Sequence, residues 1–149
     1  APPAGFLALC TSNLPSVDVI PSEHFNTVLY TGTGAAQSVT GLDFQPDFTW
    51  IKSRSQGSGA PYGGNHSLFD SIRGVGITLF SNLTNADSSF QSTSLTSFDA
   101  DGFSIGDKNA VYYNGEDLAS WNWKAGCTAV SNTNGSITSS VSDNAAAGF

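Results

Sequence analysis

The chain has 149 residues, of which 39% are hydrophobic, 11% aromatic and only 11% charged. This length corresponds to a single typical domain, which can bury a core without disulfides or metals. Twelve acidic residues against five basic ones give a net charge of −7. The chain therefore lacks the clustered Lys and Arg that bind nucleic acid or an anionic membrane, and no apolar run approaches the roughly 20 residues that span a bilayer.

Residues 1–23 contain several X-Pro steps, which disfavour helix and predict an extended linker or the end of a preceding domain. The chain has two cysteines, Cys10 and Cys127. The sequence leaves open whether they form one disulfide or remain buried thiols. Because the chain contains no Met, we expect a processed product or a piece of a longer polypeptide.

Short alternating segments separated by Gly and Asn turns predict a β-rich module over residues 24–131. Residues 26–31 and 37–42 are predicted to form a hairpin. In residues 48–54, the alternation places Phe48, Trp50 and Lys52 on one face.

A loop over residues 55–65, rich in Gly and Ser, follows that strand. Loops of this length are often functional, so it is a candidate contact surface. Further strands are predicted within residues 66–73, 77–81 and 90–98.

Three more turns are predicted in the rest of the chain. Asp99-Ala100-Asp101-Gly102 predicts a tight turn before a strand at residues 103–105. Asn114-Gly115 predicts a hairpin between residues 111–113 and 118–124. Residues 132–149 are rich in Ser and Thr and are predicted to be a C-terminal strand, turned at Asn134-Gly135, or a linker to a following module.

The fold class follows from these elements. No segment shows a 3.6-residue period, and many short strands alternate with tight turns. The prediction is an all-β fold: an antiparallel β-sandwich of jelly-roll or concanavalin-like type.

Three motifs could carry chemistry, but each has a simpler structural explanation. The Asp99–Gly102 motif lacks the further acids of a calcium loop, so a polar turn is expected, with no metal or cofactor. His66 with Asp70 lacks a nucleophile elbow, so a structural hydrogen bond of His66 or an Asp70–Arg73 pair is expected. Glu116-Asp117 is expected to be a solvated hairpin tip, because adjacent strand residues point to opposite faces.

The three tryptophans are expected to fill the core, with Trp50 the most exposed because it shares its face with Lys52 and Arg54. Sugar-binding modules often present aromatic faces to the ligand. The candidate ligand-binding residues are therefore Trp50, Lys52, Arg54, Tyr62 and His66, and no catalytic residue is predicted.

Several segments resemble a module of structural proteins of tailed bacteriophages, especially those of marine bacteria. The segment 44–55 resembles its first block, F-x-P-D-x-x-W-I-K-x-R. Further blocks follow in the same order, at residues 66–74, 79–82, 97–106 and 120–126. Residues 3–15 are similar to the end of a SPRY-like sandwich, and Gly148-Phe149 is similar to the start of a following module.

This resemblance implies a repeated module of a tail fibre or similar appendage, located on the virion surface or outside the cell. We expect a non-catalytic structural module that contributes to recognition of the host surface or of glycan. Its expected partners are other copies of itself or other virion proteins, with no nucleic acid and no membrane insertion. One alternative is a filament subunit joined by strand exchange through residues 135–149. The other is a carbohydrate-active hydrolase, which needs two carboxylates about 5–9 Å apart in a cleft.

Overall fold

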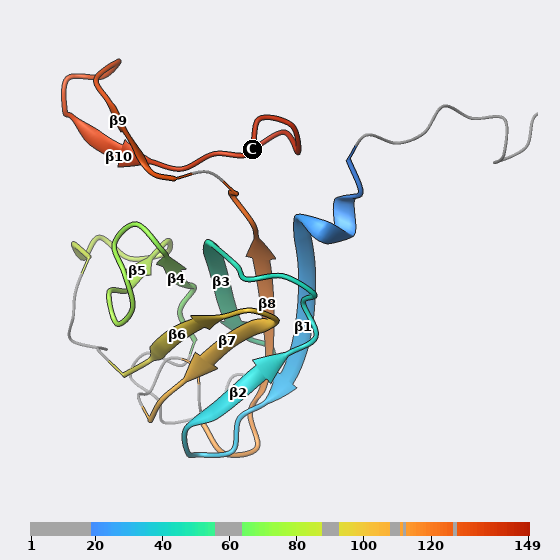
Figure 1. The fold of residues 1–149 in the computed structure, drawn as a ribbon. Helices are drawn as coiled ribbons and strands as arrows, with labels where there is room; N and C mark the ends of the chain where they lie inside the picture. Colours follow the sequence, from blue (N-terminus) through green and yellow to red (C-terminus); the bar gives the residue numbers. More distant parts are fainter. Residues whose placement is uncertain (1–18, 56–63, 88–92, 108–110, 112, 127) are drawn as a thin grey trace, which may run out of the picture.

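A computed structural model describes residues 19–55, 64–87, 93–107, 111, 113–126 and 128–149 (Figure 1). A short 3-10 helix, η2 (Pro21–Glu23), precedes the first strand. The strands are β1 (Phe25–Thr31), β2 (Gln37–Thr40), β3 (Phe48–Ser53), β4 (Ser67–Asp70), β5 (Leu79–Phe80), β6 (Leu95–Asp99), β7 (Gly102–Ile105), β8 (Asp117–Trp123), β9 (Val130–Asn132) and β10 (Ser139–Val141).

Two antiparallel sheets pack against each other. The large sheet has the strand order β1-β8-β3-β4-β5, and the small sheet has the order β2-β7-β6 (Figure 1). β9 and β10 form a separate two-stranded hairpin. The predicted all-β fold, an antiparallel β-sandwich, is therefore confirmed.

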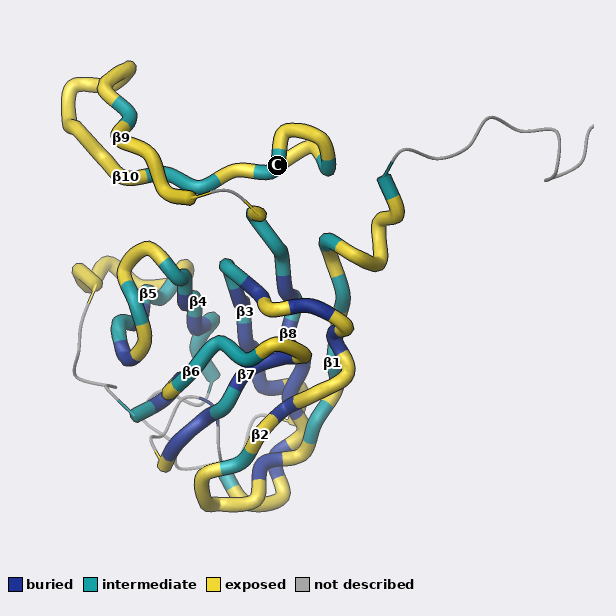
Figure 2. The backbone as a smooth tube through the Cα atoms, viewed as in Figure 1, coloured by how far each residue is buried: buried dark blue, intermediate teal, exposed yellow. Residues whose placement is uncertain are grey.

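The core lies between the two sheets and takes residues from both. In β3 buried residues alternate with half-buried ones, as expected for a strand with one face against a core (Figure 2). Each fully buried Leu, Ile or Phe side chain contributes about 1.5–3 kcal/mol through removal from water. The buried apolar residues of the core are Val39, Leu42, Phe44, Ile51, Phe69, Leu95, Phe103, Ile105, Val111 and Leu118.

The predicted hairpin of residues 26–31 and 37–42 is wrong, because β1 and β2 lie in different sheets. β1 pairs with β8, whereas β2 pairs with β7. The connection crosses from one layer to the other, so that Tyr30 of β1 and Val39 of β2 both reach the core.

The predicted hairpin at Asn114-Gly115 is also wrong as a strand pairing. β1 and β3 occupy the two edges of β8, which leaves no place beside it for residues 111–113. The turn itself is present: Gly115 has a φ of +78°, and its N–H donates to the Gly32 carbonyl over 2.8 Å. The second Asn-Gly turn, at residues 134–135, does join paired strands, since β9 and β10 are antiparallel partners.

The strands predicted within residues 66–73, 77–81 and 90–98 are present but shorter, as β4, β5 and β6. The first 18 residues of the predicted linker lie outside the described residues. The division of the chain at residues 23 and 131 stays a prediction.

The C-terminal tail contacts the body of its own chain. Asn144 Nδ2 lies 2.9 Å from His24 Nδ1 and donates to the Lys124 carbonyl over 3.1 Å. The β9–β10 hairpin is mostly exposed and lies beyond the ends of the large sheet's strands (Figures 1 and 2). A tail bound to its own chain does not favour the strand-exchange alternative.

Candidate functional site: an aromatic face on the large sheet

The candidate site is the outer side of the large sheet, where aromatic side chains of three adjacent strands form two rows. In the first row, the ring of Trp123 lies 4.9 Å from that of Phe25 and 5.2 Å from that of Phe48, measured between centroids. In the second row, the rings of Trp50 and Trp121 are 5.5 Å apart. These five residues are called the aromatic face below. Cross-strand register produces the rows, since Trp123 lies opposite both phenylalanines.

The prediction that the tryptophans fill the core is wrong. Trp121 and Trp123 are half-buried on the outer side of β8, while Leu118 and Asn122 of the same strand are fully buried toward the small sheet. The NH2 group of the Asn122 side chain has two partners there: Nδ2 donates to the Asn26 carbonyl over 3.2 Å and to the Ser120 hydroxyl over 3.0 Å. Strand alternation shows which residues share a face, but not which face meets the other sheet.

Two predicted site residues, Trp50 and His66, lie together. The Trp50 indole N–H donates to His66 Nδ1 over 3.0 Å, and the two ring centroids are 5.4 Å apart. The His66 backbone N–H donates to Asn82 Oδ1 over 2.9 Å. Because an indole is only a donor, Nδ1 must accept here, which fixes how both rings are oriented.

The other predicted site residues have different outcomes. Lys52 lies on the outer side of β3 opposite Ala119, and its ammonium donates to the Ser53 carbonyl over 2.8 Å. Arg54 is exposed just beyond the end of β3. Tyr62 and most of the loop at residues 55–65 lie outside the described residues. The structure therefore brings Trp50, Lys52 and His66 to one side of the sheet, with Arg54 at its margin.

A groove continues from the aromatic face toward the C-terminal tail. Phe48 belongs to both, and a smaller hollow of about 260 Å³ joins Phe48 and Trp123 to Phe149. The larger groove, called the tail groove below, has a volume of about 480 Å³ and is lined by Asp47, Phe48, Asp70, Ser71, Ile72, Arg73, Ala125 and residues 139–142.

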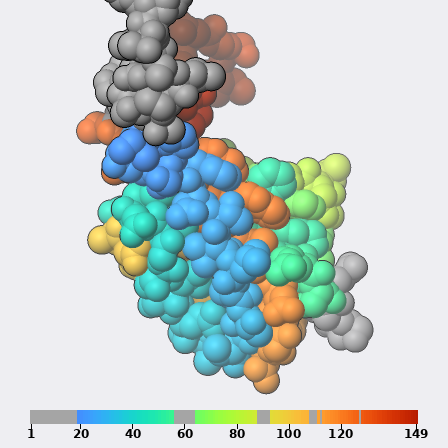
Figure 3. Space-filling model, turned by 90° about the vertical axis from the view of Figure 1, so that its right-hand side faces the viewer, coloured from blue at the N-terminus to red at the C-terminus, as the bar shows by residue number. Residues whose placement is uncertain are grey.

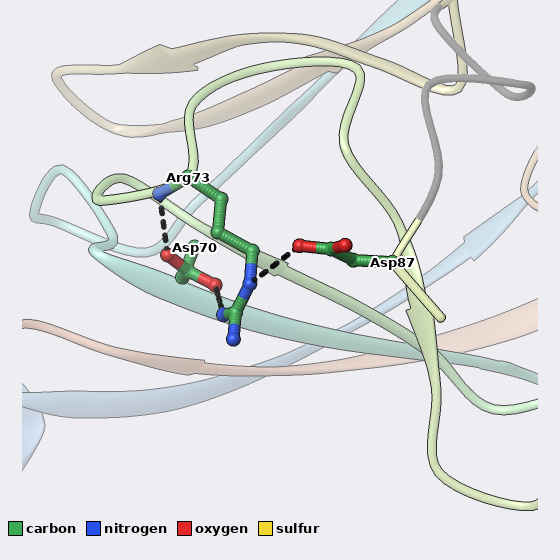
Figure 4. A network of polar contacts seen from close by, with 3 residues as sticks. All are labelled: Asp70, Arg73 and Asp87. Atoms are coloured by element: carbon green, nitrogen blue, oxygen red, sulfur yellow. Dashed lines mark hydrogen bonds and ion pairs between the residues drawn. The ribbon is translucent and has the colours of Figure 1, made fainter. Parts of the chain in front are cut away.

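Arg73 is the basic residue that lines the tail groove. Figure 4 shows its side chain between two carboxylates, Asp70 and Asp87. Its guanidinium pairs with Asp70 and, through Nε, with Asp87 at 3.3 Å. The Arg73 backbone N–H also donates to Asp70 over 2.8 Å. The expected structural pair Asp70–Arg73 is therefore present.

Asp47 holds the groove's inner wall in place. Its carboxylate accepts hydrogen bonds from Ser71 Oγ (3.0 Å), the Ala125 N–H (2.9 Å) and the Gly126 N–H (3.3 Å). Its backbone N–H donates to the Trp123 carbonyl over 2.8 Å. Donors thus surround both carboxylates of the groove, Asp47 and Asp70, which is a structural arrangement. The hydrolase alternative, which needs two carboxylates about 5–9 Å apart in a cleft, stays a prediction.

Asp101 joins the tip of the β6–β7 hairpin to the connection that follows β2. Its carboxylate accepts from the N–H groups of Asp43 (2.7 Å) and Gly41 (3.2 Å). These two hydrogen bonds, in that order, hold the pKa of Asp101 below its usual value. The Asp99–Gly102 motif is thus a polar turn. Across the described ranges, no three His, Cys, Asp or Glu residues are grouped to hold a metal ion.

The prediction of a solvated tip at Glu116-Asp117 is wrong for the first residue. Glu116 is only 4% exposed, and Ser53 Oγ donates to its carboxylate over 2.5 Å. Burial, and then the nearby Glu116 charge, raise the pKa of the Tyr30 hydroxyl far above its usual value. That hydroxyl donates to the Val111 carbonyl over 3.1 Å. Asp117, the first residue of β8, is exposed.

Sequence reasoning missed Phe25, Phe48 and Asp47 as parts of the site. Phe48 was placed on the face of Trp50, but only the register with Trp123 shows the row it belongs to. None of the described residues lies in a helix with the length and hydrophobicity needed to cross a membrane.

Comparison with known proteins gives one match. The family model of a domain of unknown function, DUF7483, matches residues 20–149, so the chain belongs to this family. No curated protein and no solved structure matches the chain.

Proposed function

We propose that this member of the DUF7483 family is a non-catalytic structural module of a virion appendage that binds glycan through its aromatic face. The observation that carries the glycan proposal is the position of Trp50, Trp121 and Trp123 on the outer side of the sheet. Aromatic rings with partly exposed faces suit the apolar C–H faces of sugar rings, and Trp combines that surface with a polar N–H. The virion setting rests on the resemblance of the blocks between residues 44 and 126 to modules of tailed bacteriophages.

The surroundings of the aromatic face support a polar but largely uncharged ligand. The tail groove adds hydroxyls of Ser71, Ser139 and Ser140, and the charges of Asp70 and Arg73 offset each other. The other carboxylate of the lining, Asp47, accepts hydrogen bonds from the protein itself. Binding sites of this kind combine apolar surface with a few polar groups that fix the orientation of the ligand. Sugar hydroxyls would bind those groups, while the rings provide the contact area.

The test is binding of a panel of bacterial surface polysaccharides, measured by calorimetry with the wild type, Trp50→Ala and Ile137→Ala. Trp50 belongs to the aromatic face, whereas Ile137 is 79% exposed in the β9–β10 turn and serves as a matched loss of exposed apolar surface. We expect Trp50→Ala to weaken binding at least about 10-fold, corresponding to about 1.4 kcal/mol. Ile137→Ala should leave the affinity unchanged.

Two results would contradict the proposal. One is the absence of binding to any polysaccharide of the panel. The other is binding that Trp50→Ala and Trp121→Ala both leave unchanged in variants whose circular dichroism matches the wild type.

A further inference from the structure

The outer edge of β1 carries backbone groups that the sheet does not use. β1 is an edge strand of the large sheet, and among the described residues only β8 pairs with it. The Lys124 N–H donates to the His24 carbonyl over 2.8 Å, and the Gly32 N–H donates to the Glu116 carbonyl over 2.9 Å. Hydrogen-bonded pairs alternate along an antiparallel ladder, so the even-numbered residues of β1 bind β8. The N–H and C=O groups of residues 25, 27, 29 and 31 therefore point away from the sheet.

Side chains satisfy two of these outward groups but leave the middle of the edge open. The Thr27 N–H donates to Asn26 Oδ1 over 2.8 Å, and Gln37 Nε2 donates to the Thr31 carbonyl over 3.3 Å. Within the part of the chain that the structure describes, the outward groups of Leu29 have no such partner. Leu29 is also 60% exposed, the highest value for a large apolar side chain of the two sheets.

The β1 edge lacks the features that usually prevent strands from pairing between molecules. Its sequence, FNTVLYT, contains no charged residue and no proline, and its register with β8 is unbroken by a bulge. Natural sheets protect long edges with Lys, Pro or bulges, because an open edge is a template for another strand. Figure 3 looks toward this side of the molecule, where β1, in blue, lies at the surface along its length.

We propose that the β1 edge binds the β1 edge of a second copy of this chain, antiparallel about a two-fold axis. The two large sheets would then form one continuous sheet. A second copy fits because a strand of seven residues needs an edge of similar length, and the other edge strands of the two sheets are shorter: β6 has five residues, β2 four and β5 two. A two-fold axis also makes the contact close on itself, so a dimer forms rather than a chain.

The chemistry of the edge suits self-association. Although the net charge of each copy is −7, the paired strands bring no charged side chains opposite each other. Antiparallel pairing would bury Leu29 beside the partner's outer side and give its N–H and C=O groups the partners they lack. The aromatic faces of the two copies would lie side by side on the same surface. This inference goes beyond glycan binding and does not depend on it.

The experiment measures the dimer dissociation constant of the full chain by sedimentation equilibrium, for the wild type, Leu29→Lys and Val75→Lys. Val75 is 49% exposed in the connection between β4 and β5, so its substitution makes the same change of charge away from the edge. Leu29→Lys removes apolar contact from both copies and places two like charges near the axis. We expect it to raise the dissociation constant about 100-fold, while Val75→Lys leaves it unchanged.

Hydrogen exchange of the wild type tests the site without any substitution. We expect exchange of the Leu29 amide to slow as the protein concentration rises, while exchange of the Val75 amide stays constant. A wild type that remains monomeric at millimolar concentration overturns the proposal. A dimer whose Leu29 amide exchanges at the same rate at all concentrations overturns it too, because the interface then lies elsewhere.

Discussion

Gly102 lets the β6–β7 hairpin pack closely against β2, and alanine at this position should destabilise the protein strongly. The backbone φ of Gly102 is +150°, and a Cβ there would lie 2.0 Å from the Val39 carbonyl oxygen. Gly102 lies opposite Thr40 in the β2–β7 ladder, so this contact is between two paired strands. The side chain would have to separate the strands or shift the whole hairpin.

The size of the effect follows from two contributions. The backbone conformation costs an L-residue about 1–3 kcal/mol. The forced contact costs about 1–3 kcal/mol more, as for other overpacked sites. We therefore expect Gly102→Ala to lower the free energy of unfolding by about 4 kcal/mol and Tm by about 10 °C.

Gly115→Ala is the matched control. Gly115 also has a positive φ, +78°, but a Cβ there would meet nothing within 4 Å. Gly115→Ala should therefore lower the free energy of unfolding by only about 1 kcal/mol. Urea denaturation followed by far-UV circular dichroism gives both values. Equal losses for the two variants would show that the contact with Val39 does not limit the fold, and the reasoning would be wrong.

Three further predictions concern the hairpin tip, the core and the tail. Hydrogen bonds from Asp43 and Gly41 lower the pKa of Asp101 in the folded protein. The ionised Asp101 carboxylate therefore stabilises the fold fully above its unfolded-state pKa of about 3.9, and this contribution is lost as pH falls through the lower folded-state pKa. Asp101→Asn should thus be less stable than the wild type at neutral pH, and urea titrations should show this difference vanishing in acid. Ile51→Ala should lower the free energy of unfolding by about 2–5 kcal/mol, because Ile51 is fully buried. Val75→Ala, at an exposed site, should change it by under about 0.5 kcal/mol in the same assay. Asn144→Ala removes the hydrogen bond to the Lys124 carbonyl and the contact with His24. Hydrogen exchange should therefore accelerate in residues 139–149, while the global unfolding midpoint stays constant. Unchanged exchange in the tail would show that Asn144 does not hold it against the rest of the chain.

The local part of this fold was accessible from the sequence, because alternation and turn chemistry act over a few residues. The segment around Trp50 was predicted as a strand and lies within β3, and the Asp99–Gly102 turn joins β6 to β7. Strand partners were not accessible, because β1 and β8 are more than 80 residues apart in the chain and their pairing depends on the whole sandwich.

The orientation of the large sheet shows a second limit. The more polar face of β8, formed by Leu118, Ser120 and Asn122, lies against the core, while the tryptophans of this strand face outward. Ile51 and Phe69, on neighbouring strands of the same sheet, point to the same side as Leu118 and determine which side is buried. Alternation places Trp50 and Lys52 on one face of their strand, but the contact of Trp50 with His66 and the tail groove join residues that spacing along the chain does not bring together.

The arrangement of the three tryptophans has a spectroscopic consequence. All of the chain's indole chromophores lie on one outer surface, and two of them are close enough, at 5.5 Å between ring centroids, to couple electronically. Tryptophan emission of this protein therefore reports on that surface, whereas the apolar interior contributes through Tyr30 and, more weakly, through Phe69 and Phe103. A ligand or a neighbouring molecule on that surface would change the emission of a fully folded protein. Loss of the core would be followed more faithfully through the far-UV signal of the strands.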